Sequence, residues 1–181
     1  MIEASPPPFY SVVPGSTVIS NRTVELVKTG RMFTLQTVIE GITVDTTKDF
    51  LFNPTAFSAG FLVVYEIMFK VSQGKGIGQF FAGGTYSGGS GLTVLNRNEN
   101  AGISPVTVIT EDPTVSVLGT GGFKYMAGGE AQGNNLAGGG GGDQNFPLEV
   151  NPAVDRIFRL IQSGGSGTYD LELRLVFAEI P

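Results

Sequence analysis

The feature that most constrains the fold is a strict two-residue alternation near the carboxyl end of the chain. In residues 169–177, apolar side chains alternate with charged ones: Tyr169, Leu171, Leu173, Leu175 and Phe177 against Asp170, Glu172 and Arg174. Successive side chains of a β-strand point to opposite faces of the sheet, whereas a helix repeats every ~3.6 residues. The alternation therefore predicts a half-buried antiparallel strand with its apolar side chains inward.

Residues 61–71 show the same period over a longer stretch. One predicted face is wholly apolar or aromatic: Phe61, Val63, Tyr65, Ile67, Phe69 and Val71. The other face combines Glu66 and Lys70 with Leu62, Val64 and Met68. Because this second face is still half apolar, the strand is predicted to be central in its sheet or to lie under a neighbouring subunit. We therefore expect Leu62, Val64 and Met68 to form the interface of a homo-oligomer.

Short β-branched runs cut by Asn, Pro and Gly fill much of the remaining chain, most clearly in residues 91–142. This punctuation is typical of a many-stranded antiparallel protein. Further strands are predicted at residues 31–39 and 154–161, with a possible first strand at residues 23–28, and no helix is predicted. We expect an all-β fold, an antiparallel two-sheet sandwich of jelly-roll type, over residues 21–181. Residues 1–20 are predicted to be an extended N-terminal arm.

The arm carries Pro6, Pro7 and Pro8, followed by Phe9 and Tyr10. Consecutive prolines fix φ and favour an extended polyproline II conformation without internal hydrogen bonds. The arm is then either a frayed terminus or a docking segment whose two aromatic side chains anchor on another protein. We expect these five residues to bind a partner.

A second candidate contact is the polar sequence Asn96, Arg97 and Asn98, which follows the apolar run of residues 92–95. One interpretation is a loop that binds a partner through its arginine. The other is a polar strand end, because asparagine readily adopts turn conformations.

The composition is unusual for a protein with a fully solvated surface. Charged residues make up 15% of the chain, hydrophobic residues make up 41%, and the mean hydropathy is +0.15. An average soluble domain has about 25% charged residues. Either the surface is built from Ser, Thr, Asn and Gly, or partner subunits cover much of it.

Several function classes are disfavoured by residue content. The net charge of −5 and the scattered basic residues argue against nucleic-acid binding, which needs clustered Lys and Arg. The chain has no Cys and no His, so thiolate sites, imidazole ligands and histidine general bases are absent. The most apolar run, residues 60–69, contains Glu66 and is far shorter than the ~20 residues of a membrane-spanning helix. We expect no metal, no cofactor, no nucleic acid and no membrane partner.

An enzymatic function is also not expected. Residues 74–78 (Gly-Lys-Gly-Ile-Gly) lack the spacing and the following Ser or Thr of a phosphate-binding loop, and they predict a hairpin turn. Carboxylates such as Glu66, Glu111 and Asp112 could form a glycosidase pair on any β scaffold. No Trp is present to provide a sugar platform. Glu111 and Asp112 are also weak candidates for a calcium site, which needs clustered oxygen ligands.

Taken together, several features resemble small virion proteins of tailed bacteriophages, of the jelly-roll head decoration (cement) type. They are the prolines at residues 6–8, short strands such as residues 93–95 and 106–108, the five glycines at residues 138–142, the amphipathic strand at residues 169–177, and the absence of Cys, His and Trp. The resemblance covers the style of the whole chain, and no family site residues are carried over from it. It implies binding to the major capsid protein on the outside of the head, often as a trimer, after synthesis in the host cytoplasm.

Three functions follow as hypotheses. The first is a non-enzymatic capsid decoration protein that stabilises the head by bridging capsomers. The alternative is a tail-fibre or receptor-binding jelly roll that recognises a host surface glycan, which aromatic residues grouped at one loop end would favour. The third is a carboxylate hydrolase, which paired carboxylates in a cleft would favour.

Overall fold

The computed structural model describes residues 18–57, 60–127 and 148–181. Within these ranges the chain forms one helix and thirteen strands. In chain order they are α1 (Val18–Lys28), β1 (Met32–Thr43), β2 (Thr47–Asn53), β3 (Phe61–Val71), β4 (Lys75–Ala82), β5 (Thr85–Ser87), β6 (Ser90–Gly91), β7 (Leu95–Asn96), β8 (Val108–Glu111), β9 (Thr114–Val117), β10 (Thr120–Ala127), β11 (Leu148–Val150), β12 (Arg156–Ser163) and β13 (Thr168–Ile180).

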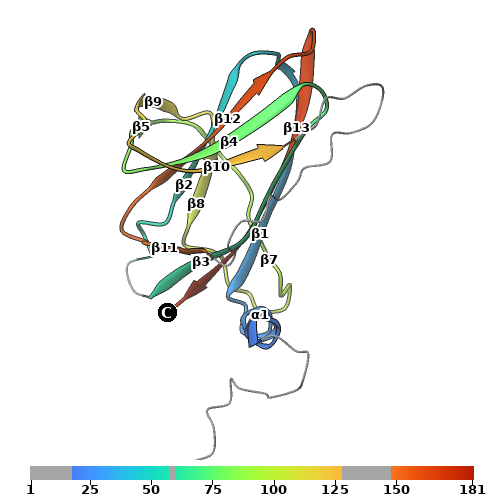
Figure 1. Ribbon diagram of the computed structural model, residues 1–181. Helices are drawn as coiled ribbons and strands as arrows, with labels where there is room; N and C mark the ends of the chain where they lie inside the picture. The colour runs from blue at the N-terminus through green and yellow to red at the C-terminus, as the bar shows by residue number, and fades with distance from the viewer. Residues whose placement is uncertain (1–17, 58–59, 128–147) are drawn as a thin grey trace, which may run out of the picture.

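Two antiparallel sheets pack face to face as a β-sandwich, which confirms the predicted all-β, two-sheet architecture (Figure 1). Sheet A has the strand order β11-β3-β13-β1-β7, and sheet B has the order β10-β4-β12-β2-β8-β6. Strands β5 and β9 form a separate two-stranded ribbon. The chain crosses repeatedly between the sheets, with β1, β3, β11 and β13 in sheet A and β2, β4, β10 and β12 in sheet B.

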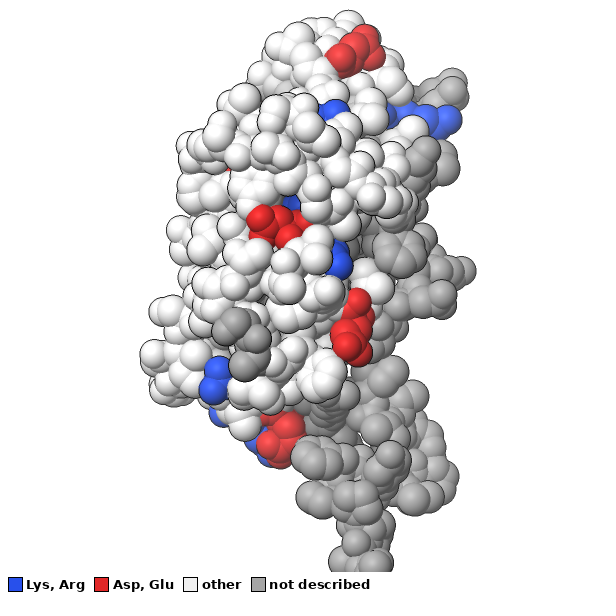
Figure 2. All heavy atoms as spheres, turned by 90° about the vertical axis from the view of Figure 1, so that its left-hand side faces the viewer, with Lys and Arg blue, Asp and Glu red and all other residues white. Residues whose placement is uncertain are grey.

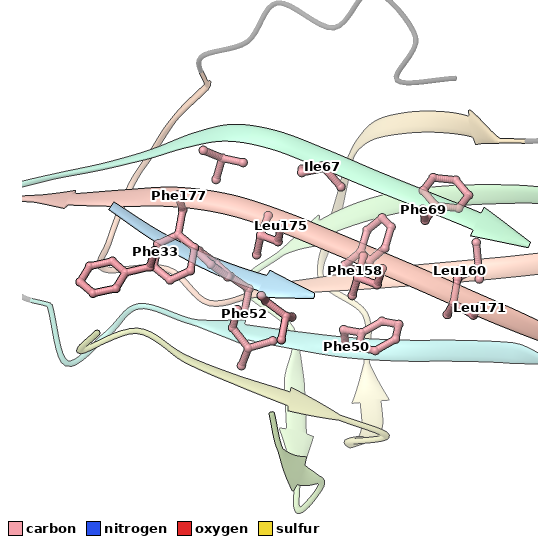
Figure 3. Packing of buried hydrophobic residues seen from close by; sticks show 14 of the residues in the cluster. Phe33, Phe50, Phe52, Ile67, Phe69, Phe158, Leu160, Leu171, Leu175 and Phe177 are labelled. Atoms are coloured by element: carbon pink, nitrogen blue, oxygen red, sulfur yellow. The ribbon is translucent and has the colours of Figure 1, made fainter. Parts of the chain in front are cut away.

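Large apolar side chains from both sheets fill the space between them (Figure 3). The ring of Phe177 on β13 lies 5.5 Å from that of Phe52 on β2, measured between centroids, in an edge-to-face arrangement. At the other end of the core, Phe69 on β3 lies 5.8 Å from Phe158 on β12. Such aromatic pairs contribute about 0.5–1.5 kcal/mol beyond the burial of their surface. These two contacts therefore stabilise the packing of one sheet against the other.

The strongest predictions from alternation are confirmed. On β13 all five side chains that were predicted to face inward are buried: Tyr169, Leu171, Leu173, Leu175 and Phe177. The predicted strand at residues 31–39 is part of β1, with Phe33 and Leu35 in the core. The predicted strand at residues 154–161 begins two residues later, at Arg156.

The segment before β1 is a helix, so the prediction of a possible strand at residues 23–28 and of no helix is wrong. Helix α1 begins at Val18, inside the predicted extended arm, and ends at Lys28. Two hydrogen bonds close its carboxyl end, from Arg31 N to Leu26 O and from Gly30 N to Val27 O. This is a Schellman motif, and the φ of +67° at Gly30 is the left-handed conformation that the motif requires.

Helix α1 covers one end of the outer face of sheet A. Leu26 packs there against Met32 of β1 and against Val176 and Ala178 of β13, which forms a second, smaller buried cluster. The segment is rich in β-branched residues, which favour strands in isolation. Tertiary packing of its apolar side decides the outcome, as it does for most helices in proteins.

Strand β3 runs over the predicted residues, but a β-bulge reverses the face assignment of its first half. Glu66 pairs with Val176 and Val64 with the next residue, Phe177, so Tyr65 is an extra residue on β3. A bulge of this kind switches the side on which the following alternation falls. As a result, Leu62 and Val64 point into the core with exposures of 0% and 3%.

The predicted oligomer interface of Leu62, Val64 and Met68 is therefore wrong in its first two residues, which are internal. Met68 alone stays on the outer face of sheet A, where it is half-buried. Its neighbours on that face form ion pairs across strands, Glu66 with Arg174 and Lys70 with Glu172. This face has a solvated, charged character, and the homo-oligomer stays a prediction without this interface to support it.

Residues 83–119 connect β4 to β10, its neighbour in sheet B. We call this segment the β4–β10 excursion. Within it, β7 pairs with β1 of sheet A, β8 pairs with β2 of sheet B, and β6 pairs with β8. The excursion thus extends both sheets beside β1 and β2 and carries the β5–β9 ribbon as well.

Candidate interaction surface

Two of the predicted contact residues on the excursion are used to fasten it to the rest of the chain. The Asn96 side-chain amide donates to Gly30 O (2.9 Å) and to Ile103 O (2.7 Å), and its oxygen accepts from Asn98 N (2.8 Å). The Asn98 amide donates to Lys28 O at 3.0 Å. Lys28 O is one of the carbonyl groups at the end of α1 that have no partner within the helix. Asn96 and Asn98 therefore support the structure, in agreement with the polar strand-end interpretation.

Arg97 differs from its two neighbours. Its backbone N–H donates to Met32 O at 2.9 Å, and its guanidinium has a weak contact of 3.8 Å with the Met32 sulfur. The side chain is otherwise exposed. Of the three predicted residues, Arg97 is the charged one, and its side chain is the most exposed of the three.

A buried carboxylate holds the next part of the excursion. Glu179 near the end of β13 is 1% exposed, and both of its oxygens accept from Val106 N at 3.0 Å. Its Oε1 also accepts from Thr107 N at 2.6 Å. Backbone donors that converge on a carboxylate stabilise its charge without a cation. This contact fixes residues 106 and 107 at the end of the sandwich.

A buried lysine holds the far side of the excursion. Lys48 on β2 donates to Glu111 Oε1 at 2.8 Å and to Asp112 Oδ2 at 2.6 Å. Burial lowers the pKa of Lys48, but the hydrogen bonds to Asp112 and Glu111 outweigh it, so the pKa lies above its ordinary value. A single ammonium group thus pairs with two carboxylates, so the cluster keeps one net negative charge.

The β5–β9 ribbon is fixed on the outer face of sheet B. Ile157 of β12 is fully buried beneath it, and a Cβ added to Gly84 would lie only 2.6 Å from the Ile157 Cδ1 atom. The Tyr86 hydroxyl donates to Asp155, and it accepts from the Asn53 amide at 3.4 Å. Burial raises the pKa of Asp155, and the nearby Arg156 charge partly opposes this.

On this anchored frame the excursion exposes several aliphatic side chains. Among described residues, eight large hydrophobic side chains are strongly exposed, and four of them belong to the excursion, with exposures between 41% and 60%: Leu95, Val106, Val108 and Val117. Half of the strongly exposed large hydrophobic side chains among the described residues thus lie on this segment of the chain, and such groups are the usual material of a protein contact surface when they gather on one face.

Few charges accompany these aliphatic groups. The excursion contains only Arg97, Glu99, Glu111 and Asp112 as charged residues, and the last two are paired with Lys48. Figure 2 shows the side of the molecule on which β5 and β9 lie, and its surface is largely uncharged with a few isolated groups. A surface with few charged groups loses little hydration free energy when a partner covers it.

An open groove of about 460 Å³ lies in the first half of the excursion. Aliphatic and small polar residues line it: Val94, Leu95, Asn96, Asn98, Glu99, Gly102, Ile103, Ser104 and Pro105. No aromatic residue is among them. The groove therefore offers no ring on which a sugar could stack, and it does not form a carboxylate pair either, because Glu99 is its only acid.

Other expected site features have mixed outcomes. Pro6, Pro7, Pro8, Phe9 and Tyr10 lie outside the described residues, so their role stays a prediction. No group of three or more Asp or Glu side chains that could hold a metal ion occurs in the described ranges. Over the same ranges, no helix has the length and apolar character needed to cross a bilayer.

Sequence reasoning missed the two buried anchors of the excursion, Glu179 and Lys48. The sequence did indicate both, because Glu179 falls on the same face of its strand as Phe177, and Lys48 falls on the same face as Phe50 and Phe52. A charged residue at an inward position of a strand must find partners inside the protein.

Comparisons with family models, with curated proteins and with solved structures gave no match.

Proposed function

We propose that this protein is a non-enzymatic structural protein of a virion, a decoration protein that binds the major capsid protein on the outside of the head. The observation that carries the proposal is the β4–β10 excursion, which is firmly anchored yet exposes four large aliphatic side chains and few unpaired charges. Such a surface suits a permanent contact with a protein lattice better than transient chemistry on a small substrate.

The connectivity supports the same proposal. In a jelly roll of eight strands, the sheets have the orders 1-8-3-6 and 2-7-4-5. Counted without the excursion, the strands here follow β1-β13-β3-β11 and β2-β12-β4-β10, which is the same pattern. We therefore infer a jelly roll with an insertion between its fourth and fifth strands. Jelly rolls are frequent in viral capsid proteins, although a fold alone does not define a function.

The N-terminal segment is proposed as a second attachment point. Pro6, Pro7 and Pro8 restrict the chain to extended conformations, so less conformational entropy is lost when the arm binds. Phe9 and Tyr10 are large side chains of the kind that dominate interface energies. A variant that starts at Ser16 keeps all of α1 and should fold normally while binding heads more weakly. Phe9→Ala with Tyr10→Ala should reproduce most of that loss, about 2–4 kcal/mol.

Surface variants of the excursion test the proposal directly. Leu95→Glu and Val108→Glu place a charge at exposed positions, so they should leave the fold unchanged but weaken binding to heads, because the charge must be desolvated in the contact. Val38→Glu is the matched control, since Val38 is equally exposed but lies on β1 outside the excursion. If both excursion variants bind purified heads as tightly as wild type and the control, the excursion is not the contact surface.

Assembly into a homotrimer is part of the proposal and rests on the resemblance alone. Closed rings are a common form of homo-oligomer. Sedimentation of the protein at micromolar concentration tests this, and a stable monomer would count against it. The alternative of a glycan-binding tail-fibre module is less well supported, because the groove on the excursion has no aromatic lining.

A further inference from the structure

Besides Lys48, a second cation of the described chain, Arg156, has an inward position in the sandwich. On β12 the even positions face the core, as the buried Phe158 and Leu160 show, and Arg156 shares their alternation. Its guanidinium is half-buried and donates to Val154 O at 2.7 Å. Arginine side chains are seldom placed among apolar residues unless a counter-charge accompanies them.

No described carboxylate supplies that counter-charge. Arg156 is absent from the ion pairs of the described residues. Its sequence neighbour Asp155 alternates to the other face of sheet B, where the Tyr86 hydroxyl binds it. Burial lowers the pKa of Arg156, and the charge of Asp155 opposes this only in part. The guanidinium thus bears a desolvation cost that no described acidic side chain offsets through an ion pair.

The same arginine lines a cavity of about 180 Å³ between the two sheets. The walls come from both sheets and are apolar: Phe52 and Phe80 from sheet B, and Val64, Ile67, Val150 and Leu175 from sheet A. Among the described lining residues Glu149 is the only acidic one, and its side chain is exposed, while its neighbours Leu148 and Val150 alternate toward the core. An apolar chamber with a single cation results.

We propose that this cavity binds a small monocarboxylate with an apolar body, an aromatic or medium-chain aliphatic acid, whose carboxylate pairs with Arg156. Charge complementarity selects the carboxylate, because a guanidinium forms two parallel hydrogen bonds with such a group. The volume of the cavity sets the size of the ligand's apolar part, since an apolar cavity of about 150 Å³ can hold one benzene molecule. A pocket with apolar walls and one oriented polar group is the usual form of a small-molecule site. This inference is independent of the proposed capsid function.

Titration of the full-length protein with benzoate and with hexanoate tests the proposal by calorimetry and by chemical shifts of the cavity methyl groups. Both acids should bind and raise the melting temperature. Hexan-1-ol, which has no charge, and hexylammonium, which has the opposite charge, should bind more weakly. Inorganic phosphate should not bind, because it has no apolar body. If neither acid binds, or if the alcohol binds as tightly as hexanoate, the proposal is wrong.

Two variants assign the binding to the residue and to the cavity. Arg156→Met should weaken hexanoate binding by about ten- to hundredfold, the loss expected for a charged hydrogen-bond partner, and leave hexan-1-ol binding unchanged. Arg159→Met is the matched control, because Arg159 faces outward and pairs with Asp49, so its loss should not affect binding. Equal hexanoate affinity in wild type and Arg156→Met would overturn the proposal.

Leu148→Trp provides a second route if Arg156→Met does not fold. Leu148 is half-buried in the lining, and a larger side chain there should block the cavity and abolish binding of both acids.

Discussion

Removal of the Glu179 carboxylate should detach the excursion from the end of the sandwich. Glu179→Ala deprives Val106 N and Thr107 N of their acceptor, and the second of these donors is buried. A hydrogen bond to a charged group contributes about 1.5–3 kcal/mol, and a buried donor without a partner costs about 1–3 kcal/mol. The variant also avoids the desolvation of a carboxylate, which offsets part of this loss. We therefore expect the free energy of unfolding to fall by about 2–4 kcal/mol, a large share of the 5–15 kcal/mol typical of a domain.

Urea unfolding followed by far-ultraviolet circular dichroism measures this change. Hydrogen exchange should show at the same time that the amides of Val106 and Thr107 lose protection. Glu179→Gln keeps one acceptor oxygen and should cost about 1 kcal/mol. Glu172→Ala is the matched control, since its carboxylate lies on the partly exposed outer face of the same strand and its pairing with Lys70 is worth less than about 1 kcal/mol. Stability of Glu179→Ala within error of wild type, with both amides still protected, would refute this reasoning.

Three further changes test the fold. Gly30→Ala should lower the free energy of unfolding in urea by about 1–3 kcal/mol, because φ is +67° and the new Cβ would lie 2.3 Å from Ala101 Cβ. Gly91→Ala is the control and should be neutral, because its new Cβ would lie in open space. Lys48→Met should lower stability by about 1–3 kcal/mol at pH 7. The pKa of Lys48 in the folded protein is above the ordinary 10.5, so the stabilisation by Lys48 is complete below pH 10.5 and is lost as the pH rises through the folded pKa. If the stability difference between wild type and Lys48→Met stayed the same above that pH, the assignment would be contradicted. Leu173→Asp should abolish the folded circular dichroism spectrum, since a buried, unpaired charge costs about the whole stability margin, and a native spectrum would show the alternation of β13 to be misassigned.

The strands could be predicted where the alternation of side chains is regular. Strand β13 keeps one alternation from Tyr169 to Phe177, and β12 pairs with strands on both sides without interruption, so pattern and structure agree. A period of two residues fixes the buried face once the register is fixed. It does not reveal a bulge, because the extra residue at Tyr65 leaves no mark in the pattern of β3.

Helix α1 was missed because local preference and tertiary structure disagree. Val18, Val24 and Val27 favour a strand by preference alone. The apolar spacing of Ile19, Leu26 and Val27 and the glycine at position 30 were nevertheless present as helix signals. What decides between the two is the outer face of β13, and a contact so distant in sequence cannot be read from the segment itself.

The candidate sites depend on residues whose environment only the fold defines. Asn96 and Asn98 looked like contact residues because they are polar, and the structure uses their amides to bind Gly30 O and Lys28 O. Arg156 looked like an ordinary strand residue, but its alternation with Phe158 directs it inward. Polarity predicts exposure on average, and the exceptions are the informative positions.

The central claim, attachment to the virion head, is tested most directly by fractionation of phage particles from a producing host. Heads, tails and unassembled protein are separated by density-gradient sedimentation and each fraction is probed for this chain. The account predicts that the chain sediments with heads in a fixed ratio to the major capsid protein. Detection with tails would favour the receptor-binding alternative, and detection only among unassembled proteins would contradict a structural role in the virion.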